Sequence, residues 1–592
     1  MFLITTANQS FWKTDKPVLF LGEWCKLFSQ RAVWEKLSYE VLPYHWDDRK
    51  KLYQDYLYLD KLYEQILSEL SQRLNQIHGV KHSVRYWRII VGRWLSYFIQ
   101  IFYDRYQSIL TAAESGKVTN TLIGKYDREQ WVPRDHRVFQ AWAANNDDYN
   151  HYLYSRLIEC TKRIPFDILE VKTNVNTTID SHNNNDKHSF NLKSLLKYLV
   201  KCYRKLRPDC LNQIVLVSPP FKICDLMKLQ FSLGQLPYLS PPDIISPDSD
   251  VNWDLRKNLS FTSSSDEFEQ LLSSIIKEQI PTVYVEDFWQ MNEVSLRTYP
   301  KKPKAILNAT ASSSNDAFKF WAAHNADRGT KLLGTQHGGC WGTRLWESYE
   351  KHELSIYDYF YTWGWNSQAK ENIKPLPLVK FNTIKRSVHS RKDGRLLLVL
   401  MAMPRYCYLM YSVPVASTGI LSYFNDQYRF VRSLSEENQK LLLVRLYCHD
   451  YGWSQKAQWS CEFPDIEYYS GNKTMTDQLA KSRLFIGTYH GTTYTETFVA
   501  NYPSILFWNP DHWELKPAVQ PYFDELHRAG ILHYTPQSAA KKVNEICDDP
   551  LSWWRQPEIQ EAKNEFCYQF AHTSSNWLRE WKSELKTVKS HS

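Results

Sequence analysis

Short apolar runs alternate with helix-period stretches along the C-terminal two thirds of the chain. The first series of runs lies at residues 214–217, 305–308, 331–335 and 357–363. The second series lies at residues 396–401, 441–447, 484–487 and 504–508. Short buried strands that alternate with helices are typical of parallel sheets of Rossmann type. The pattern therefore predicts two facing α/β domains with a cleft between them.

The N-terminal part of the chain has a different pattern. Two apolar runs, at residues 3–6 and 18–22, predict strands. Residues 50–115 carry apolar and aromatic side chains at helical spacing, with few glycines or prolines to interrupt them. We therefore expect helices to be added to the first α/β domain on its N-terminal side.

Two polar segments separate this helical region from the first series of strands. Residues 172–190 are rich in turn-forming side chains, which predicts a flexible loop, and residues 192–207 form a basic helical stretch. We expect an N-terminal domain over residues 1–385, with a helical insertion at about 50–210, and a C-terminal domain over residues 386–592.

Composition indicates large cores and few glycine loops. The chain has 592 residues, of which 43% are hydrophobic and 23% charged, so it is not disordered as a whole. Aromatic residues make up 15%, whereas there are only 19 glycines. Clusters of glycine are therefore informative wherever they occur.

Charge, cysteine content and hydropathy exclude several classes. The net charge of +8 is spread over the whole chain, which permits an anionic substrate or membrane surface but does not fit a nucleic-acid-binding protein. The 11 cysteines show no CxxC spacing and are typical of reduced intracellular thiols. No apolar run reaches the roughly 20 residues of a spanning helix. We expect a cytoplasmic protein that contacts the inner membrane only peripherally.

The densest glycine cluster follows a predicted strand. Gly334 lies in this strand, and Gln336, His337, Gly338 and Gly339 form the turn after it. In open α/β sheets ligands bind outside the carboxyl ends of strands, and glycines let the backbone approach a ligand closely. We expect Gln336, Gly338 and Gly339 to line the cleft and His337 to act as acid or base. A tight turn with a capping histidine is the alternative.

A second His-Gly turn ends a strand of the later series. His490 and Gly491 precede Thr492, Thr493 and Glu496 at the start of a predicted helix. Free N–H groups and the helix dipole favour an anion such as phosphate at this point, and Glu496 is placed to reach ribose hydroxyls. Thr493 and Glu496 also have the spacing of a capping box, which needs no ligand. Both interpretations remain open.

Two arginines follow strands of the later series. Arg405 and Arg445 lie where a phosphate would bind, and a surface salt bridge is an equally good explanation for each. Thr474 and Asp477 have capping-box spacing before a helix, so we expect a simple cap there.

Carboxylates near the predicted cleft offer catalytic candidates. Glu286, Glu347, Glu350 and Asp358 lie near strand ends, where burial can create a base or nucleophile. No Asp-x-Asp follows an apolar strand, so we expect no metal site. The chain also lacks the Walker loop, the Gly-x-Gly-x-x-Gly loop, the Gly-x-Ser-x-Gly elbow and zinc-ligand spacings.

At the two His-Gly turns, the sequence resembles a family of transferases found among bacterial O-antigen and capsule biosynthesis genes. Residues 3–6, 85–90 and 358–365 fit the same resemblance. More distantly, the chain is similar to retaining capsule glycosyltransferases that use CMP-activated ulosonic acids such as Kdo and pseudaminic acid. The resemblance implies a GT-B arrangement, with an N-terminal acceptor domain, a C-terminal nucleotide-sugar domain and catalysis in the cleft.

These observations predict a glycosyltransferase of surface polysaccharide synthesis that needs no metal or other cofactor. A CMP-linked nonulosonic acid is the expected donor, and an oligosaccharide or lipid-linked glycan the expected acceptor. His337 would take the acceptor proton, with Glu286 or Glu347 as nucleophile or orienting partner in a retaining mechanism. A non-catalytic carbohydrate-binding or assembly protein is the alternative, because abundant aromatic residues also suit sugar stacking.

The donor contacts follow from the second turn. His490, Thr492 and Thr493 are expected to hold the donor phosphate, with Glu496 on the ribose and Arg445 assisting. The basic stretch at residues 192–207 is the predicted contact with anionic lipid, and an ordinary solvated helix is an equally good explanation.

Overall fold

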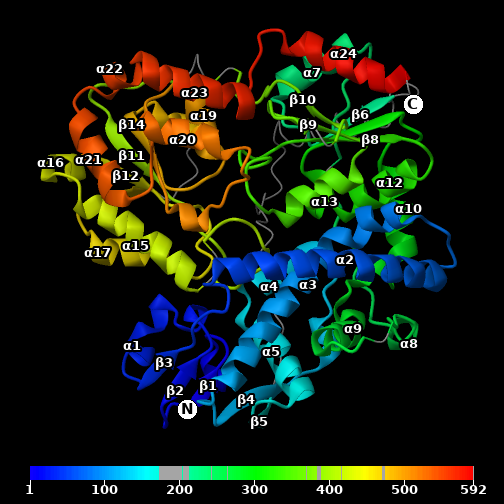
Figure 1. Ribbon diagram of the computed structural model, residues 1–592. Helices are drawn as coiled ribbons and strands as arrows, with labels where there is room; N and C mark the ends of the chain where they lie inside the picture. Colours follow the sequence, from blue (N-terminus) through cyan, green and yellow to red (C-terminus); the bar gives the residue numbers. More distant parts are fainter. Residues whose placement is uncertain are drawn as a thin grey trace, which may run out of the picture.

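The computed structural model describes residues 1–171, 203, 213–241, 243–262, 264–367, 370–382, 384, 388–414, 417–469 and 474–590. Within these residues the chain forms three parallel β-sheets with helices packed against them (Figure 1). The predicted loop at residues 172–190 lies outside the described residues. The same holds for the basic stretch at residues 192–207, apart from Tyr203.

The first sheet belongs to the N-terminal part of the chain. Its strands are β1 (Phe2–Ile4), β2 (Val18–Phe20), β3 (Tyr39–Val41), β4 (Asn120–Lys125) and β5 (Phe166–Glu170). They lie in the order β3-β2-β1-β4-β5. The two strands predicted near the N-terminus are confirmed as β1 and β2. That they would begin a sheet of their own was not predicted.

Two long helices connect the first sheet to the rest of the molecule. They are α2 (Arg49–His78) and α3 (Val84–Glu114), and they confirm the helical spacing. Gly79, in the left-handed conformation, ends α2, and the Ser83 side chain caps α3. Most of α3 is buried, because it packs against elements on both sides: α2, α4 (His136–Asn145), α5 (Asp147–Thr161), α9 (Glu267–Gln279), α12 (Asp316–Ala326) and α13 (Ser348–Ile356).

The second sheet carries the first predicted series of strands. It consists of β6 (Ile214–Val217), β7 (Ala305–Asn308), β8 (Lys331–Thr335), β9 (Tyr359–Thr362) and β10 (Ile373–Pro375). Their order is β10-β9-β8-β7-β6, so each strand pairs with the next along the chain. One face is covered by α7 (Ile223–Ser232) and α24 (Trp577–Ser590), and the other by α12 and α13, with α10 (Phe288–Thr298) packed against α12 (Figure 1).

The third sheet carries the second predicted series. Its strands are β11 (Arg395–Val399), β12 (Leu442–Arg445), β13 (Glu467–Tyr469), β14 (Ser482–Gly487), β15 (Ser504–Phe507) and β16 (Leu532–His533). Their order, β13-β12-β11-β14-β15-β16, is the Rossmann order, with its reversal between β11 and β14. The helices of this part are α15 (Thr418–Arg432), α17 (Gln455–Glu462), α18 (Met475–Leu479), α19 (Thr492–Val499), α20 (Gln520–Arg528), α21 (Pro536–Ile546), α22 (Pro550–Trp554) and α23 (Pro557–Phe570).

The second and third sheets form the predicted pair of α/β units. After α23 the chain crosses from the third sheet to the second, where α24 packs (red in Figure 1). Trp581 and Leu585 of α24 lie in one apolar cluster with Leu216 of β6 and Tyr361 of β9. The expected α/β class, with two Rossmann-type units in a GT-B-like arrangement and a helical N-terminal elaboration, is therefore confirmed.

Candidate functional site

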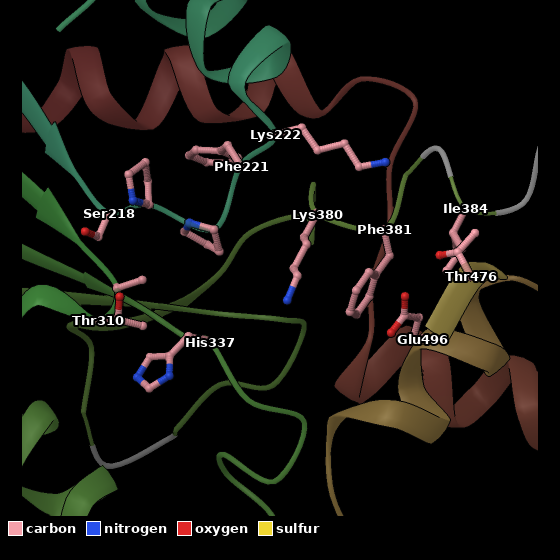
Figure 2. A pocket seen from close by; sticks show the side chains of 13 residues that line it. Ser218, Phe221, Lys222, Thr310, His337, Lys380, Phe381, Ile384, Thr476 and Glu496 are labelled. Carbon is pink, nitrogen blue, oxygen red and sulfur yellow. The ribbon is translucent and has the colours of Figure 1, made fainter. Parts of the chain in front are cut away.

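A cavity of about 490 Å³ lies between the second and third sheets (Figure 2). We call it the interdomain cavity. Its walls come from the loops after β6, β7 and β8, from the linker between the sheets, and from α18 and α19. The lining residues are Ser218, Pro219, Pro220, Phe221, Lys222, Ala309, Thr310, His337, Lys380, Phe381, Ile384, Thr476 and Glu496.

The topology of the second sheet explains this location. Its strands are parallel, so the segments that follow β6, β7 and β8 all emerge at one edge. Ser218, Ala309 and His337 each come one or two residues after their strand and reach the cavity. This is the edge at which α/β sheets bind ligands.

His337 is held by a buried carboxylate. Its Nε2 lies 3.1 Å from Oε1 of Glu353 on α13, and the Trp341 indole donates to Oε2 of the same carboxylate at 3.0 Å. A carboxylate only accepts hydrogen bonds, so Nε2 carries the hydrogen of this contact, and in the neutral form of the ring the lone pair is on Nδ1. The His337 side chain is 14% exposed, and the ring lines the cavity. The geometry suits a general base.

Gln336 fixes the turn that carries His337. Its buried amide oxygen accepts from the Trp363 backbone N–H and from the Trp365 indole, both at 2.9 Å. Its amide nitrogen donates to the Gly338 carbonyl at 2.8 Å. Gln336, predicted to line the cleft, is therefore a structural residue that is fully buried.

The two His-Gly turns touch each other across the domains. The Gly339 N–H donates to Oγ1 of Thr492 at 3.0 Å. A β-carbon at position 339 would lie 2.8 Å from the carbonyl oxygen of Gly491, so this close approach requires glycine. The Thr343 hydroxyl lies 2.7 Å from Nε2 of His490. The segment after β8 thus docks on the N-terminus of α19.

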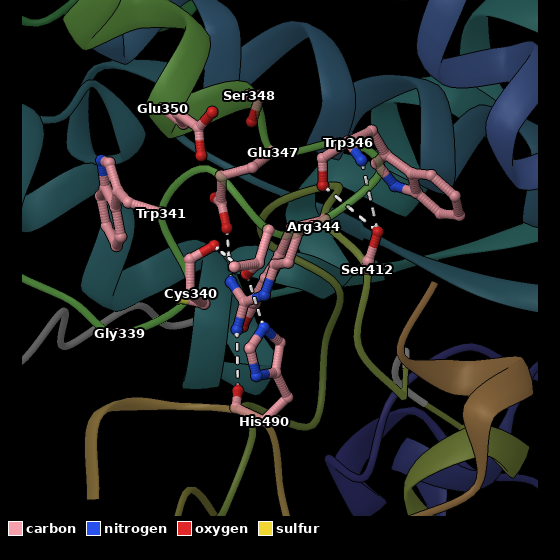
Figure 3. A network of polar contacts seen from close by, with 12 residues as sticks. Gly339, Cys340, Trp341, Arg344, Trp346, Glu347, Ser348, Glu350, Ser412 and His490 are labelled. Carbon is pink, nitrogen blue, oxygen red and sulfur yellow. Dashed lines mark hydrogen bonds and ion pairs between the residues drawn. The ribbon is translucent and has the colours of Figure 1, made fainter. Parts of the chain in front are cut away.

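His490 belongs to this interdomain contact (Figure 3). The Thr343 hydroxyl donates to the Cys340 carbonyl, so it accepts from the Nε2–H of His490. Nδ1 of His490 accepts from the Tyr494 hydroxyl at 2.9 Å. Burial, and next the charge of Arg344, hold the pKa of His490 well below its ordinary value. The ring is neutral and both nitrogens are occupied, so the predicted phosphate contact of His490 is wrong.

The capping-box interpretation makes Thr493 the N-cap residue, which would precede the helix. In the structure Thr493 lies within α19, which begins at Thr492. Gly491 is the N-cap residue and provides no side-chain cap, so the Thr493–Glu496 capping box is wrong. The Thr493 hydroxyl donates to the Tyr489 hydroxyl at 3.1 Å. Glu496 lines the interdomain cavity instead, and burial raises its pKa. The other predicted capping box, of Thr474 and Asp477, is confirmed at α18.

The two predicted donor arginines do not line the cavity. Arg405 is buried between the first and third sheets, where it donates to the Trp24 carbonyl at 2.7 Å and to Asp147 at 2.8 Å. Its predicted contact with the donor is therefore wrong. Arg445, at the end of β12, donates to the Gln478 side chain at 2.5 Å. Its charge lowers the pKa of Glu496, although burial of this carboxyl has the larger, opposite effect.

Each of the two predicted catalytic glutamates forms an ion pair with a buried arginine. Glu286 accepts two hydrogen bonds from Arg256, at 2.7 and 2.8 Å. Glu347 pairs with Arg344 (Figure 3), and burial raises the pKa of Glu347 although the arginine opposes this. Neither carboxylate lines the interdomain cavity, so their assignment as nucleophiles is not supported by the geometry.

The other two carboxylates considered are also engaged in structural contacts. Glu350 accepts from the Gly342 N–H and from Lys516, and Asp358 accepts from Arg85 and from the Leu332 N–H.

Sequence reasoning missed three side chains around the cavity. Lys222 and Lys380 line it, and Glu353 stands behind His337. Lys222 follows the Pro-Pro turn after β6. Its position shortly after a buried strand could have marked it as a candidate site residue. Lys380 lies in the linker between the sheets, and no pattern marks it. Glu353 lies on α13, where helix periodicity does not single it out.

Within the described residues the structure contains neither a metal-binding cluster nor a membrane-spanning helix. Across the described ranges, no group of three or more His, Cys, Asp or Glu side chains is arranged to hold a metal ion. Among the helices that the structure describes, none is both long enough and apolar enough to cross a bilayer.

Comparisons with known proteins add a family and several fold neighbours. A family model described as LIC12162 family transferase matches residues 1–585. No curated protein matches the chain.

Three solved structures are similar at low identity. MurG from Acinetobacter baumannii is 9% identical, with 63% of this chain and 99% of that chain covered and a TM-score of 0.30. The catalytic domain of starch synthase IV from Arabidopsis thaliana is 10% identical, with 52% and 77% covered and a TM-score of 0.28. The trehalose-6-phosphate synthase OtsA is 9% identical, with 53% and 78% covered and a TM-score of 0.32.

Proposed function

Because the chain belongs to the LIC12162 family of transferases, we propose that it is a glycosyltransferase acting in the interdomain cavity. The donor is a nucleotide-activated sugar, and a CMP-linked nonulosonic acid is the donor that the resemblance of the two His-Gly turns favours. The acceptor is an oligosaccharide or lipid-linked glycan of a bacterial surface polysaccharide. A lipid-linked acceptor would bring the protein to the inner face of the membrane.

The observation that carries this proposal is the pairing of His337 with Glu353 at the cavity wall. The 3.1 Å contact between Nε2 and the carboxylate leaves Nδ1 as the ring nitrogen for a substrate. In the proposed reaction Nδ1 takes the proton of the acceptor hydroxyl. The acceptor oxygen bonds to the anomeric carbon, and the bond from this carbon to the phosphate oxygen breaks, with its electron pair leaving on the phosphate.

Two lysines that line the cavity suit the departing phosphate. Helix α19 reaches the cavity through Glu496, while its uncapped N-terminus lies against the segment after β8. The side chains of Lys222 and Lys380 add positive charge at the cavity wall (Figure 2). These cationic groups would stabilise the leaving nucleotide, so the proposal needs no metal ion. Glu496, on the same side, is the proposed ribose contact.

A donor screen tests the proposal. Purified protein is incubated with CMP-Kdo, CMP-pseudaminic acid or several UDP-sugars and capsule-type acceptors, and products are analysed by mass spectrometry. We expect a glycosylated acceptor and free CMP, and His337→Ala lowers turnover by about 10²-fold or more. The anomeric configuration of the product, read by NMR, then separates retention from inversion. No nucleotide release with any donor would overturn the proposal.

Calorimetry with the same purified protein distinguishes a glycosyltransferase from the alternative, a non-catalytic carbohydrate-binding protein. A non-catalytic carbohydrate-binding protein would bind glycan in calorimetry without binding any nucleotide. The lysines at the cavity wall favour nucleotide binding instead, so we expect CMP to bind even without acceptor.

A further inference from the structure

Helix α7 exposes a stripe of large apolar side chains. Ile223, Met227 and Phe231 are spaced four residues apart and are 63%, 39% and 55% exposed. Residues at this spacing lie on one face of a helix. Leu236, shortly after the helix, is 42% exposed. Contiguous exposed apolar side chains are unusual on a protein surface and mark interaction sites.

The stripe shares its surface with α24. The inward side chains Leu229 of α7 and Trp581 and Leu585 of α24 pack in one cluster with Leu216 and Tyr361 of the second sheet. Both helices therefore cover the same face of this sheet and lie side by side (Figure 1). Their outward sides form one surface, which we call the α7–α24 surface.

Exposed charge on α24 is positive. Its outward side carries Arg579 and Lys586, which are exposed, with Lys582 and Lys589 half-buried beside them. The two acidic residues of α24 have partners. Glu580 accepts from Ser574, and Glu584 accepts from Lys374 and Tyr361.

We propose that the α7–α24 surface docks on an anionic phospholipid bilayer. The apolar stripe would enter the boundary between headgroups and acyl chains, while the arginine and lysines of α24 would contact anionic headgroups. A protein partner would fit the stripe, but the adjacent row of cations favours the anionic lipid surface. Phe221 and Lys222, which line the interdomain cavity, directly precede α7. Docking would therefore bring one wall of the cavity to the bilayer.

Vesicle sedimentation tests the proposal with the full chain. We expect binding to vesicles of phosphatidylcholine with about 30 mol% phosphatidylglycerol, which have a moderately anionic surface, and little binding to vesicles of pure phosphatidylcholine. The triple variant Ile223→Ser, Met227→Ser, Phe231→Ser is expected to bind at least about tenfold more weakly, because it removes the inserted apolar area. The double variant Arg579→Glu, Lys586→Glu is expected to lose the preference for phosphatidylglycerol.

Matched controls separate docking from unfolding. Ile245→Ser and Leu57→Ser remove apolar side chains that are 79% and 50% exposed away from this surface, and they are expected to bind vesicles like the wild type. All variants should keep the wild-type melting temperature. Equal binding of the triple variant and the wild type, binding without lipid-charge preference, or dimerisation through the stripe in light scattering would each overturn the proposal. Docking needs no transfer reaction, so its outcome is independent of the proposed function.

Discussion

The contact between Glu353 and His337 allows a sharp prediction for the variant Glu353→Gln. The wild-type carboxylate accepts two hydrogen bonds, from Nε2 of His337 at 3.1 Å and from the indole of Trp341 at 3.0 Å. A glutamine of the same shape offers one acceptor and one donor group. The Trp341 indole only donates, so it takes the amide oxygen. The amide nitrogen then faces His337 and makes Nε2 an acceptor.

The consequence is a change of tautomer. With Nε2 accepting, the ring proton moves to Nδ1, the nitrogen that the wild-type geometry leaves for the substrate. General base catalysis contributes about 10²–10⁴-fold, so kcat should fall by that factor in Glu353→Gln. CMP affinity should change little, because neither residue belongs to the cationic wall. Since both hydrogen-bonded positions stay filled, the protein should fold normally.

Two measurements check this reasoning. Imidazole ¹⁵N shifts of His337 report the tautomer whether or not the donor has been identified, so they should change from Nε2–H to Nδ1–H. In the double variant Glu353→Gln, Trp341→Phe the amide oxygen is released to His337, so part of the lost kcat should return. A folded Glu353→Gln protein that keeps the Nε2–H tautomer and a kcat within a few-fold of wild type would refute the positioning role.

Four further predictions follow from other contacts. Thr492→Val removes the acceptor of the Gly339 N–H, so the free energy of unfolding in a denaturant titration should fall by about 1–3 kcal/mol; an unchanged value would mean that the interdomain contact contributes nothing. Lys380→Ala should weaken CMP binding about tenfold in calorimetry, since it removes a cation from the cavity wall; equal affinity would exclude it from the site. Glu286→Gln should lower stability because it breaks a buried ion pair, while kcat stays within a few-fold of wild type; a folded variant with kcat reduced about 10²-fold or more would return Glu286 to catalysis. His490 has its pKa well below 6.5 when folded and near 6.5 when unfolded, so its stabilising contribution is complete above pH 6.5 and is lost as the pH falls. The difference in unfolding free energy between wild type and His490→Gln should therefore shrink by about 1.4 kcal/mol for each unit below about pH 6, and a pH-independent difference would contradict the neutral ring.

Sequence patterning located eight strands of the second and third sheets closely, for a physical reason, but it missed the edge strands β10, β13 and β16. Strands β7 and β8 are short, buried on both faces and bounded by turn residues, so they read as isolated apolar runs. The first sheet was harder to predict. Its strands β1 and β2 are three residues long. Strand β4 pairs with β1 although β2, β3, α2 and α3 lie between them in the chain, so adjacency along the chain did not reveal this pairing.

The residues of the site were predicted less well, because the type of a residue does not reveal which side chain it contacts in the fold. The sequence places Glu286 and Glu347 near strand ends, but it does not reveal that Arg256 and Arg344 pair with them. A buried arginine that satisfies a carboxylate removes it from substrate chemistry, and such pairs form between segments whose contact only the fold determines. Glu353 is the opposite case. Nothing in the helical pattern around it indicates a function, yet its carboxylate contacts His337 at the cavity.

The two His-Gly turns show how the surroundings of a motif decide its role. His337 and His490 follow strands in the same way, yet one faces a cavity beside a carboxylate and the other is buried against a threonine and a tyrosine. A carboxylate leaves the first ring with a free basic nitrogen, whereas the two hydroxyl partners occupy both nitrogens of the second. The second turn also holds the N-terminus of α19 against the first, through the hydrogen bond from Gly339 to Thr492. The interdomain contact thus fixes the distance between the proposed base and Glu496, the proposed ribose contact on α19, so a substitution in it is expected to affect turnover without touching either substrate.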